Sequence, residues 1–594
     1  GRNSTGSSSW SSRHQVDCDP SPATALNSSC VLLGPLNRRI LFHANTSMLV
    51  SAALLLGTGG GEPLLPSGFR LAVWPPLPPP PPPPPPSPEP PPPSPHPPPP
   101  EVQIDDDVRE AVSAMSIEQK VGQMTQIDIS QVVSYTGNCK GGFLWADRRS
   151  CQPELDRQKL RTWLSQFGLG SLLNSPYASG CVGSVCGWTA AQFRAFVREV
   201  QLEAAAVGVP PLLFGLDSTH GAAYVLDATV LPHQLSVGAT FSTARARQFG
   251  AIQAKDTLAA AVPWLFSPVL GLATNPLWPR VYETFGEDPA LVSALGAATI
   301  VGIQSVTTLV PPSPPAPQGD RPPPEQSAAR WSFESNDTVP TGAAACAKHF
   351  IGYSSPRSGH DKTPVFLPQR ELLQYHVPPW RAAVQAGVLT AMEGRARAAG
   401  GSRRRRASGW LEGLPSVGTR YHELNDEPVV SSEALLGDLL RGQIGFEGLL
   451  VTDWGETGLA RGGARHQWGL IHGQRLGEIN SLETEHHTAR SGEEAVQSAI
   501  NSTSIDVSMV PLDESFSRSL VRLVRAGRVP ESRIDESAAR VVQLKKTLGL
   551  LSQPVPPLSH PYLHTVGAAE DRAAALDIAR EAVVLLKNEP PPAE

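Results

Sequence analysis

The chain has 594 residues, more than one hydrophobic core usually organises, so we expect several domains or long insertions. Proline accounts for 61 residues, about twice the usual share in soluble proteins, and most of the excess lies in a few tracts. The formal net charge of -6 excludes the basic footprint of a nucleic-acid-binding protein. We therefore expect neutral or small partners and no nucleic acid.

The N-terminal part of the chain has two low-complexity stretches. Residues 1–74 mix serine, asparagine and glycine without sustained periodicity, which predicts little fixed structure. Residues 75–100 are almost continuous proline, which predicts an extended polyproline linker. Its Ser-Pro runs resemble the hydroxyproline-rich modules of plant and algal wall proteins, which favours an association with the cell wall. The apolar run at 48–57 is about half of the ~20 residues that a membrane span needs, so we interpret it as a signal-like remnant, with a short buried segment as the alternative.

Cysteines and sequons are compatible with a secreted protein. The close pairs Cys139 with Cys151 and Cys181 with Cys186 allow two disulfides, whereas no second pair stands at ligand spacing with histidines, so no metal site is expected. Glycosylation sequons occur at Asn3, Asn27, Asn45, Asn336 and Asn501. The predicted location is extracellular or cell wall, with a vacuolar or lysosomal location as the alternative.

A folded domain is predicted over residues 101–555. It opens with apolar residues at helical spacing, Val108, Val112, Met115 and Val121. Apolar runs then recur, each followed by an amphipathic stretch: "VPPLLFGLD", "WLFSPVLGLATNP", "ACAKHFIGY", "GVLTAME", "GLLVTDW" and "SIDVSMVP". Such runs alternating with helices indicate a parallel sheet that is buried on both faces. Aperiodic stretches near 311–338 and 394–413 are predicted to be surface insertions.

The end of the chain is predicted to leave this domain. The amphipathic pattern of "ESRIDESAARVVQLKKTLGL" predicts its last helix. Residues 556–570 are then expected to be a linker, and residues 571–594 to be the helix and first strand of a further α/β domain.

Polar residues stand at the C-terminal ends of these apolar runs. They are Asp217 with His220, Lys348 with His349, Glu393, and Asp453. Both a (β/α)8 barrel and a doubly wound sheet place ligands at that edge. No glycine-rich dinucleotide fingerprint follows any of the runs, so an α/β fold of the (β/α)8 TIM-barrel type is predicted.

Asp453 is the strongest candidate for catalysis. An anionic oxygen beside the flat face of Trp454 suits an oxocarbenium-like centre and a stacked sugar, and a retaining glycosidase needs such a nucleophile with a second carboxyl about 5 Å away. The alternative is an aspartate that caps the next helix.

The other rim motifs also allow two interpretations. Asp217 could accept hydrogen bonds from sugar hydroxyls or cap a helix. Arg280 could donate to hydroxyls, while the acids Glu283, Glu287 and Asp288 hold the arginine and its loop. Lys348 and His349 are adjacent, so only one of them should face inward unless the strand ends between them.

These pieces, in this order, resemble glycoside hydrolase family 3. The motifs are "PPLLFGLDSTHGA", "PLWPRVYETFGEDP", "AKHFIGYSSPRSGHDKTP", "GFEGLLVTDWGE", "IDVSMVP" and "AREAVVLLKN". The resemblance implies a barrel followed by an α/β sandwich domain and a carbohydrate substrate, and nothing in the sequence suggests a cofactor. It also implies that Asp453 is the nucleophile, that Asp217, Arg280, Lys348 and His349 hold the glycone hydroxyls, and that Trp454 flanks the aglycone.

The implied activity is that of a retaining, exo-acting β-glucosidase on β-glucosides or β-glucan oligosaccharides. Two-domain members of the family take their acid/base carboxylate from the second domain, of which this chain is expected to supply only the start. The alternatives are a barrel that binds carbohydrate without efficient turnover, or a hydrolase like the β-N-acetylglucosaminidases, which use a histidine and an aspartate of a barrel loop. His360 and Asp361 are the adjacent pair that would serve there.

Overall fold

The computed structural model describes residues 104–137, 151–175, 181–182, 185–310, 339–361, 363–394, 423–454, 479, 482, 488–509 and 512–586. All of them lie within the unit Ser94–Glu594. The expected low-complexity region and polyproline linker lie outside the described residues. The same holds for the insertion at 311–338, nearly all of that at 394–413, Cys139, and the four sequons that precede Asn501.

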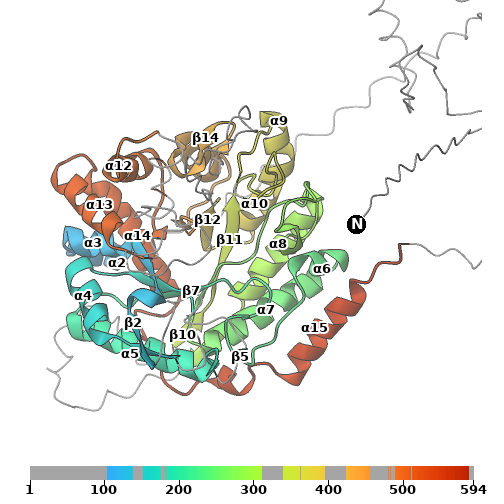
Figure 1. Ribbon diagram of the computed structural model, residues 1–594, viewed down its shortest axis with the longest axis horizontal. Coiled ribbons are helices and arrows are strands. Elements are labelled where there is room, and N and C mark those ends of the chain that lie inside the picture. Colours follow the sequence, from blue (N-terminus) through green and yellow to red (C-terminus); the bar gives the residue numbers. More distant parts are fainter. Residues whose placement is uncertain are drawn as a thin grey trace, which may run out of the picture. The chain divides into compact units, whose positions relative to one another are not determined.

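Eight parallel strands form the centre of this unit (Figure 1). They are β1 (Thr125–Asp128), β4 (Ser171–Leu173), β7 (Leu213–Leu216), β8 (Trp264–Leu265), β11 (Ala344–Phe350), β12 (Thr390–Glu393), β15 (Leu449–Val451) and β16 (Ser508–Met509). Neighbours in space follow the order of the chain, and β16 pairs with β1. The (β/α)8 prediction is confirmed.

The barrel closes between β15 and β16. Val451 bridges Val507 in parallel, the Val507 amide donates to the Leu450 carbonyl at 3.0 Å, and the Thr452 amide donates to the Val507 carbonyl at 3.0 Å. The Asp506 carboxylate strengthens this seam, because it accepts from the Leu450 amide at 2.9 Å. The strand that precedes Asp453 is therefore held on both edges.

Helices cover the outside of the barrel and connect its strands, as parallel pairing requires. They are α2 (Asp106–Ser113), α3 (Ile117–Gln123), α4 (Arg157–Phe167), α5 (Ala190–Val207), α6 (Gln234–Ala239), α7 (Thr243–Ala259), α8 (Pro289–Gln304), α9 (Gln369–Glu371), η5 (Leu372–His376), α10 (Val377–Gln385), η7 (Glu433–Gln443), α12 (Gly492–Ser502), α13 (Ser515–Arg525) and α14 (Glu531–Thr547). Their ends follow local chemistry. For α5, a capping box of Thr189 and Gln192 begins the helix and left-handed Gly208 ends it.

Four short antiparallel pairs of strands lie outside the eight-stranded sheet in the described part of the chain. They are β2 (Val133–Gly137) with β3 (Cys151–Leu155), β5 (Cys181–Val182) with β6 (Val185–Cys186), β9 (Thr307–Val310) with β10 (Val339–Gly342), and β13 (Glu423–Leu424) with β14 (Glu427–Pro428). In the β5–β6 hairpin, Cys181 and Cys186 are directly opposite partners along the backbone. This backbone register is compatible with the cysteine pairing that the sequence suggested.

Two features of the fold differ from the sequence-based expectation. The apolar spacing from Val108 to Val121 belongs to two helices, because Ser116 begins α3 with a capping box of its own. Strands β1 and β4 were not predicted, because three of the four residues in "TQID" are polar and "SLL" is only three residues long. The six strands predicted from apolar runs are all present.

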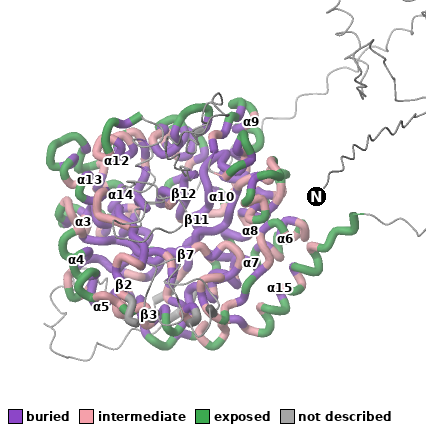
Figure 2. Tube along the Cα trace, in the orientation of Figure 1, coloured by how far each residue is buried: buried purple, intermediate pink, exposed green. Residues whose placement is uncertain are grey.

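The barrel interior is a packed core and not a channel. Figure 2 shows β7, β11 and β12 as buried segments at the centre. Inward side chains of the strands meet the last barrel helix, α14, through Leu213, Trp264, Met392, Val507, Val541 and Leu544. The Trp264 indole N–H donates to Thr390 Oγ1 at 2.8 Å, so the one polar atom of that side chain is satisfied inside the core.

The C-terminal helix α15 (Ala569–Glu581) lies against α6 and α7 (Figure 1). Ion pairs join it to α7: Arg245 with Glu581 at 2.5 Å and Lys255 with Asp571 at 2.8 Å. The helix expected here is present, but the described residues that follow it, 583–586, form no strand and are exposed. An apolar tetrapeptide without a neighbouring strand has no backbone partner with which to form a sheet.

Candidate active site

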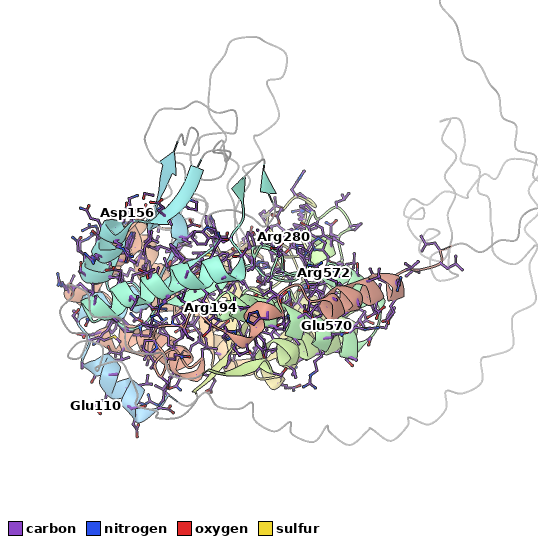
Figure 3. The ribbon with its side chains drawn as sticks, turned by 90° about the horizontal axis from the view of Figure 1, so that it is seen from below. Glu110, Asp156, Arg194, Arg280, Glu570 and Arg572 are labelled. Carbon is purple, nitrogen blue, oxygen red and sulfur yellow. The ribbon has the colours of Figure 1, made fainter. Side chains whose placement is uncertain are left out.

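The predicted site residues gather at the carboxyl edge of the barrel. Asp217 follows β7, Arg280 lies in the loop after β8, Lys348 and His349 lie in β11, and Asp453 follows β15. In Figure 3, Arg280 is labelled on the side from which the hairpins project, and Glu110 of α2 is labelled on the opposite side. This edge is where (β/α)8 proteins build their ligand sites.

Lys348 and His349 reach the site from adjacent positions in one strand. The pairing of β11 with β12 shifts register between Lys348 and Phe350, which is a bulge. A bulge breaks the alternation of side chains between the two faces of a strand. In a regular strand, adjacent residues such as Lys348 and His349 would point to opposite faces. Because the strand is irregular at this point, both side chains can face the site.

Lys348 forms an ion pair with Asp217. The Nζ atom of Lys348 donates to Asp217 Oδ1, which joins the third barrel strand to the fifth. The lysine side chain is 3% exposed, whereas that of Asp217 is 41% exposed. The aspartate therefore has one side on the buried ammonium and another side open to solvent.

His349 lies against Asp453. The distance between His349 Nε2 and Asp453 Oδ2 is 3.5 Å, and both residues are buried. The Trp454 amide donates to Asp453 Oδ1 at 2.5 Å, which orients the carboxylate further. Trp454 is partly buried and packs against the interior core of the barrel.

Arg280 is held by an acid, as expected. Its Nε and Nη2 atoms donate to the two oxygens of Glu283 at 2.8 and 2.7 Å, a bidentate pair. Its Nη1 atom donates to the hydroxyl of Tyr353 at 3.2 Å. Burial alone would lower the pKa of Arg280, but Tyr353, Glu283 and Asp453 together raise that pKa well above its ordinary value. The guanidinium is thus a fixed, permanent cation.

Asp288, a later acid of the same motif, has a structural role. Asp288 caps α8, because its Oδ1 atom accepts from the Ala290 amide at 2.7 Å. Gly238 of α6 packs so tightly on this loop that an added Cβ would stand 1.9 Å from the Phe285 carbonyl oxygen. The arginine loop is therefore fixed to the helix outside it.

Tyr353 was missed by the sequence reasoning. It is buried, its ring centroid lies 4.8 Å from that of His349, and its hydroxyl meets Arg280. Burial raises the pKa of its phenol, so the hydroxyl stays protonated. The signal was present in "AKHFIGY", where an aromatic residue with a polar tip ends the same apolar run.

Three further rings, those of His220, His233 and Tyr282, pack on one another beside the arginine loop. The rings of His220 and His233 lie 4.2 Å apart, and the ring of Tyr282 meets His233 edge-on at 4.5 Å. Burial, and then the adjacent His220, lower the pKa of His233. His220 thus packs locally, with Nδ1 at 3.3 Å from the Leu231 carbonyl.

Other acids at the strand ends are more enclosed. Glu393 is fully buried at the end of β12. Asp128 ends β1, where it accepts from the Asn174 side chain at 2.6 Å, and burial raises the pKa of its carboxyl. Asp128 and Asn174 were not identified from the sequence, because the strands that carry them were not predicted.

A parallel barrel whose carboxyl edge gathers carboxylates, cations and aromatic rings has the architecture of many sugar hydrolases. The chain belongs to glycosyl hydrolase family 3, because the model of the N-terminal domain of that family matches residues 116–544. The resemblance seen in the motifs is confirmed.

Curated relatives and solved structures agree with this assignment. The lysosomal beta glucosidase of Dictyostelium discoideum is 34% identical over 480 residues, which is 80% of this chain and 48% of that protein. The periplasmic beta-glucosidase of Salmonella typhimurium is 24% identical over 487 residues, or 81% of this chain and 48% of that protein. The chain thus spans about half the length of the curated relatives it matches.

Two solved structures show the same fold. An exo-1,3/1,4-beta-glucanase from a Pseudoalteromonas species aligns with a TM-score of 0.57 at 24% identity, over 82% of this chain and 48% of that one. The beta-glucosidase from Listeria innocua in complex with glucose aligns with a TM-score of 0.55 at 24% identity, over 82% of this chain and 52% of that one. Within the described part of the chain, no helix is long and apolar enough to span a membrane.

Proposed function

We propose that the chain is the barrel of a retaining, exo-acting β-glucosidase that acts on β-glucosides or β-glucan oligosaccharides, with Asp453 as its nucleophile. The observation that carries this proposal is a chain of contacts from Asp453 to His349, from His349 to Tyr353, and from Tyr353 to Arg280. It brings side chains from β11, from the end of β15 and from the loop after β8 to one place.

The chemistry follows from these neighbours. The Asp453 carboxylate attacks the anomeric carbon, a bond forms to Oδ, and the bond to the leaving oxygen breaks. The Arg280 guanidinium interacts electrostatically with this carboxylate, and the His349 Nε2 atom lies 3.5 Å from its Oδ2 atom. Asp217, Lys348, Arg280 and His349 supply acceptors and donors for the glycone hydroxyls, and Trp454 supplies an apolar face for the aglycone. A proton for the leaving oxygen must come from a separate acid.

The test is mechanism-based labelling of the full chain with 2,4-dinitrophenyl 2-deoxy-2-fluoro-β-D-glucoside. The activated leaving group departs without an acid, so the covalent intermediate accumulates even where the acid is missing. The expected result is a 2-fluoroglucosyl group on the peptide that contains Asp453, and no label in the Asp453→Asn variant. A label on another carboxylate, or none on any peptide, rejects the proposal.

A second candidate function is carbohydrate binding without efficient turnover. It is favoured by one observation, the coverage of only about half of each relative, since a catalytic acid can belong to the unmatched half. Loss of general acid catalysis typically costs about 10²- to 10⁴-fold in rate, and most for poor leaving groups. If the full chain hydrolyses cellobiose as efficiently as it hydrolyses dinitrophenyl glucoside, this candidate fails. Glucose binding with label formation but without cellobiose turnover supports it.

For the location we propose the extracellular space or the cell wall, with a vacuolar or lysosomal compartment as the alternative. The sequons and the proline tract at 75–100 support the first, and the name of the Dictyostelium relative favours the second. Fractionation of cells that express the tagged chain, with removal of N-glycans from Asn501 as the readout of secretory transit, distinguishes both from a cytosolic location.

A further inference from the structure

One carboxylate joins the two loops that surround Arg280. Asp361 Oδ1 accepts from the indole N–H of Trp278 at 3.0 Å and from the hydroxyl of Tyr353 at 2.7 Å. Trp278 belongs to the loop after β8, and Tyr353 and Asp361 belong to the loop after β11. Trp278 and Tyr353 are both nearly completely buried, and their rings meet edge-on at 5.4 Å.

The bonds at Asp361 fix the direction of the Tyr353 hydroxyl. A phenol has one proton to donate, and Tyr353 donates it to Asp361. The lone pairs of the phenol oxygen are then available to accept from Arg280 Nη1, at 3.2 Å. Hydrogen bonds in such a chain polarise one another, so the carboxylate makes the phenol a better acceptor for the guanidinium.

Arg280 is consequently held on all three nitrogens and keeps donors for a ligand. Arginine carries five N–H donors. Two of them are taken by Glu283 and one by Tyr353, so two remain, one on Nη1 and one on Nη2. Donors on two neighbouring nitrogens suit a pair of vicinal hydroxyl oxygens, and the direction in which they point depends on the Tyr353 bond.

Other contacts join the same two loops independently of Asp361. Asn275 Nδ2 donates to the Pro356 carbonyl at 3.0 Å, and the hydroxyls of Thr274 and Ser355 lie 2.7 Å apart. A Cβ added at Gly359, where φ is +76°, would stand 2.6 Å from Leu277, which shows how closely the loops pack. The loops are therefore expected to keep their fold when the Asp361 carboxylate is removed.

We propose that Asp361 is a positioning residue for sugar binding: through the Tyr353 hydroxyl it sets the orientation of the Arg280 donors that hold two ring hydroxyls of the glycone. This inference rests on the proposed function, and it assigns Asp361 a role other than that of an acid beside His360. His360 is exposed, whereas the Asp361 carboxylate accepts from both buried partners.

The test measures glucose binding to the full chain by isothermal titration calorimetry. Asp361→Ala removes the acceptor and is expected to raise the Kd for glucose about tenfold, the loss of one hydrogen bond to a charged group. Asp361→Asn keeps an Oδ1 acceptor and is expected to stay within about threefold of the wild type. Asp438→Ala is the matched control, because Asp438 lies exposed on η7, away from the site, and should leave the Kd unchanged.

A double-mutant cycle separates positioning from general damage. Tyr353→Phe should weaken binding by itself, and adding Asp361→Ala to it should change the Kd less than about twofold further, because the connecting hydroxyl is already gone. Wild-type affinity in Asp361→Ala, or full additivity with Tyr353→Phe, overturns the inference while the proposed function stands. If the wild-type chain neither binds glucose nor becomes labelled at Asp453, the proposed function fails and this inference fails with it.

Discussion

His349 and Asp453 stand 3.5 Å apart although their strands are not neighbours, because β12 lies between β11 and β15 in the sheet. The contact therefore crosses the top of the barrel and does not follow a pair of adjacent strands. It brings an imidazole to the carboxylate that we propose as the nucleophile. Removal of the His349 imidazole should affect the reaction of Asp453 more than the stability of the sheet.

The first prediction concerns this contact. His349→Ala should slow inactivation by the 2-fluoroglucoside about 10- to 100-fold, because it removes the polar group 3.5 Å from Asp453 Oδ2, and loss of a polar neighbour from a buried polar atom costs roughly 1–3 kcal/mol. His349→Gln, which retains a donor, should recover part of the rate. The measurement is the second-order rate constant of inactivation, with the exposed variant His564→Gln as the control. Equal rates for the wild type and His349→Ala would show that the imidazole does not assist Asp453.

The second prediction uses the unequal burial of Lys348 and Asp217. Asp217→Asn leaves an ammonium that is 3% exposed without its carboxylate, whereas Lys348→Met leaves a carboxylate that water can still reach. A buried charge without a partner destabilises the folded state strongly. Asp217→Asn should therefore lower the free energy of unfolding more than Lys348→Met does. Urea denaturation of both variants decides the order. The reverse order would contradict this account of the pair.

The third prediction concerns the foot of the barrel seam. Asp506 is fully buried and accepts from Arg441 at 3.0 Å, Arg540 at 3.1 Å and the Leu450 amide at 2.9 Å. Burial would raise the pKa of Asp506, but the charges of Arg540 and Arg441 lower it below its ordinary value. Asp506→Asn should therefore destabilise the chain by about 3–5 kcal/mol, because it removes the carboxylate that pairs with the partly buried Arg441 and leaves Arg540 with Glu536 alone.

The matched control for Asp506 is an exposed ion pair. Glu514 and Arg518 stand four residues apart on the surface, with 3.4 Å between Oε1 and Nε. Glu514→Gln should change the free energy of unfolding by roughly 0.5 kcal/mol or less. A loss of similar size in both variants would mean that the Asp506 network contributes no more than a surface pair.

The fourth prediction is a pH dependence that arises from His376. Burial lowers the pKa of His376 to about 4, and in the described part of the structure its Nε2 atom has no hydrogen-bond partner. Between pH ~6.5, the ordinary pKa of histidine, and pH 4, His376 is protonated in the unfolded chain but stays neutral in the folded chain. The contribution of neutral His376 to the free energy of unfolding is therefore fully present above pH ~6.5. It is lost as the pH falls, by at most about 1.4 kcal/mol per pH unit.

The measurement is urea denaturation at several pH values between 4 and 7. His376→Leu should flatten the decline relative to the wild type, whereas His564→Leu, at an exposed position, should not. An identical decline in the wild type and in His376→Leu would assign the acid sensitivity to other groups.

The sequence predicted the parts of this fold that have a strong local signal. Runs such as "GLLVTDW" identify β15 and the residue after it, since a fully buried strand leaves no other place for a polar side chain than its end. Strands β1 and β4 have no such signal, because their pairing with neighbours, and not their composition, makes them strands.

The sequence named residues that the structure brings to one edge of the barrel, but it did not predict the contacts between them. Asp217 and Lys348 are 131 positions apart, and no pattern along the chain states that they form an ion pair. Tyr353 was missed, and Asp361 was considered only as an acid beside His360, because a tyrosine in a loop and an acid beside a histidine are common in any surface segment. Only the three-dimensional arrangement shows that both contact the surroundings of Arg280.

The seam between Leu450 and Val507 has a consequence for synthesis in the cell. Seven of the strands, including the one that leads to Asp453, are complete by residue 454, but the eighth begins only at Ser508. A nascent chain that has emerged from the ribosome only as far as residue 454 would expose the unpaired edges of β1 and β15, which are templates for association with other chains. We expect chaperones that shield such edges to act on this protein until Met509 has emerged from the ribosome.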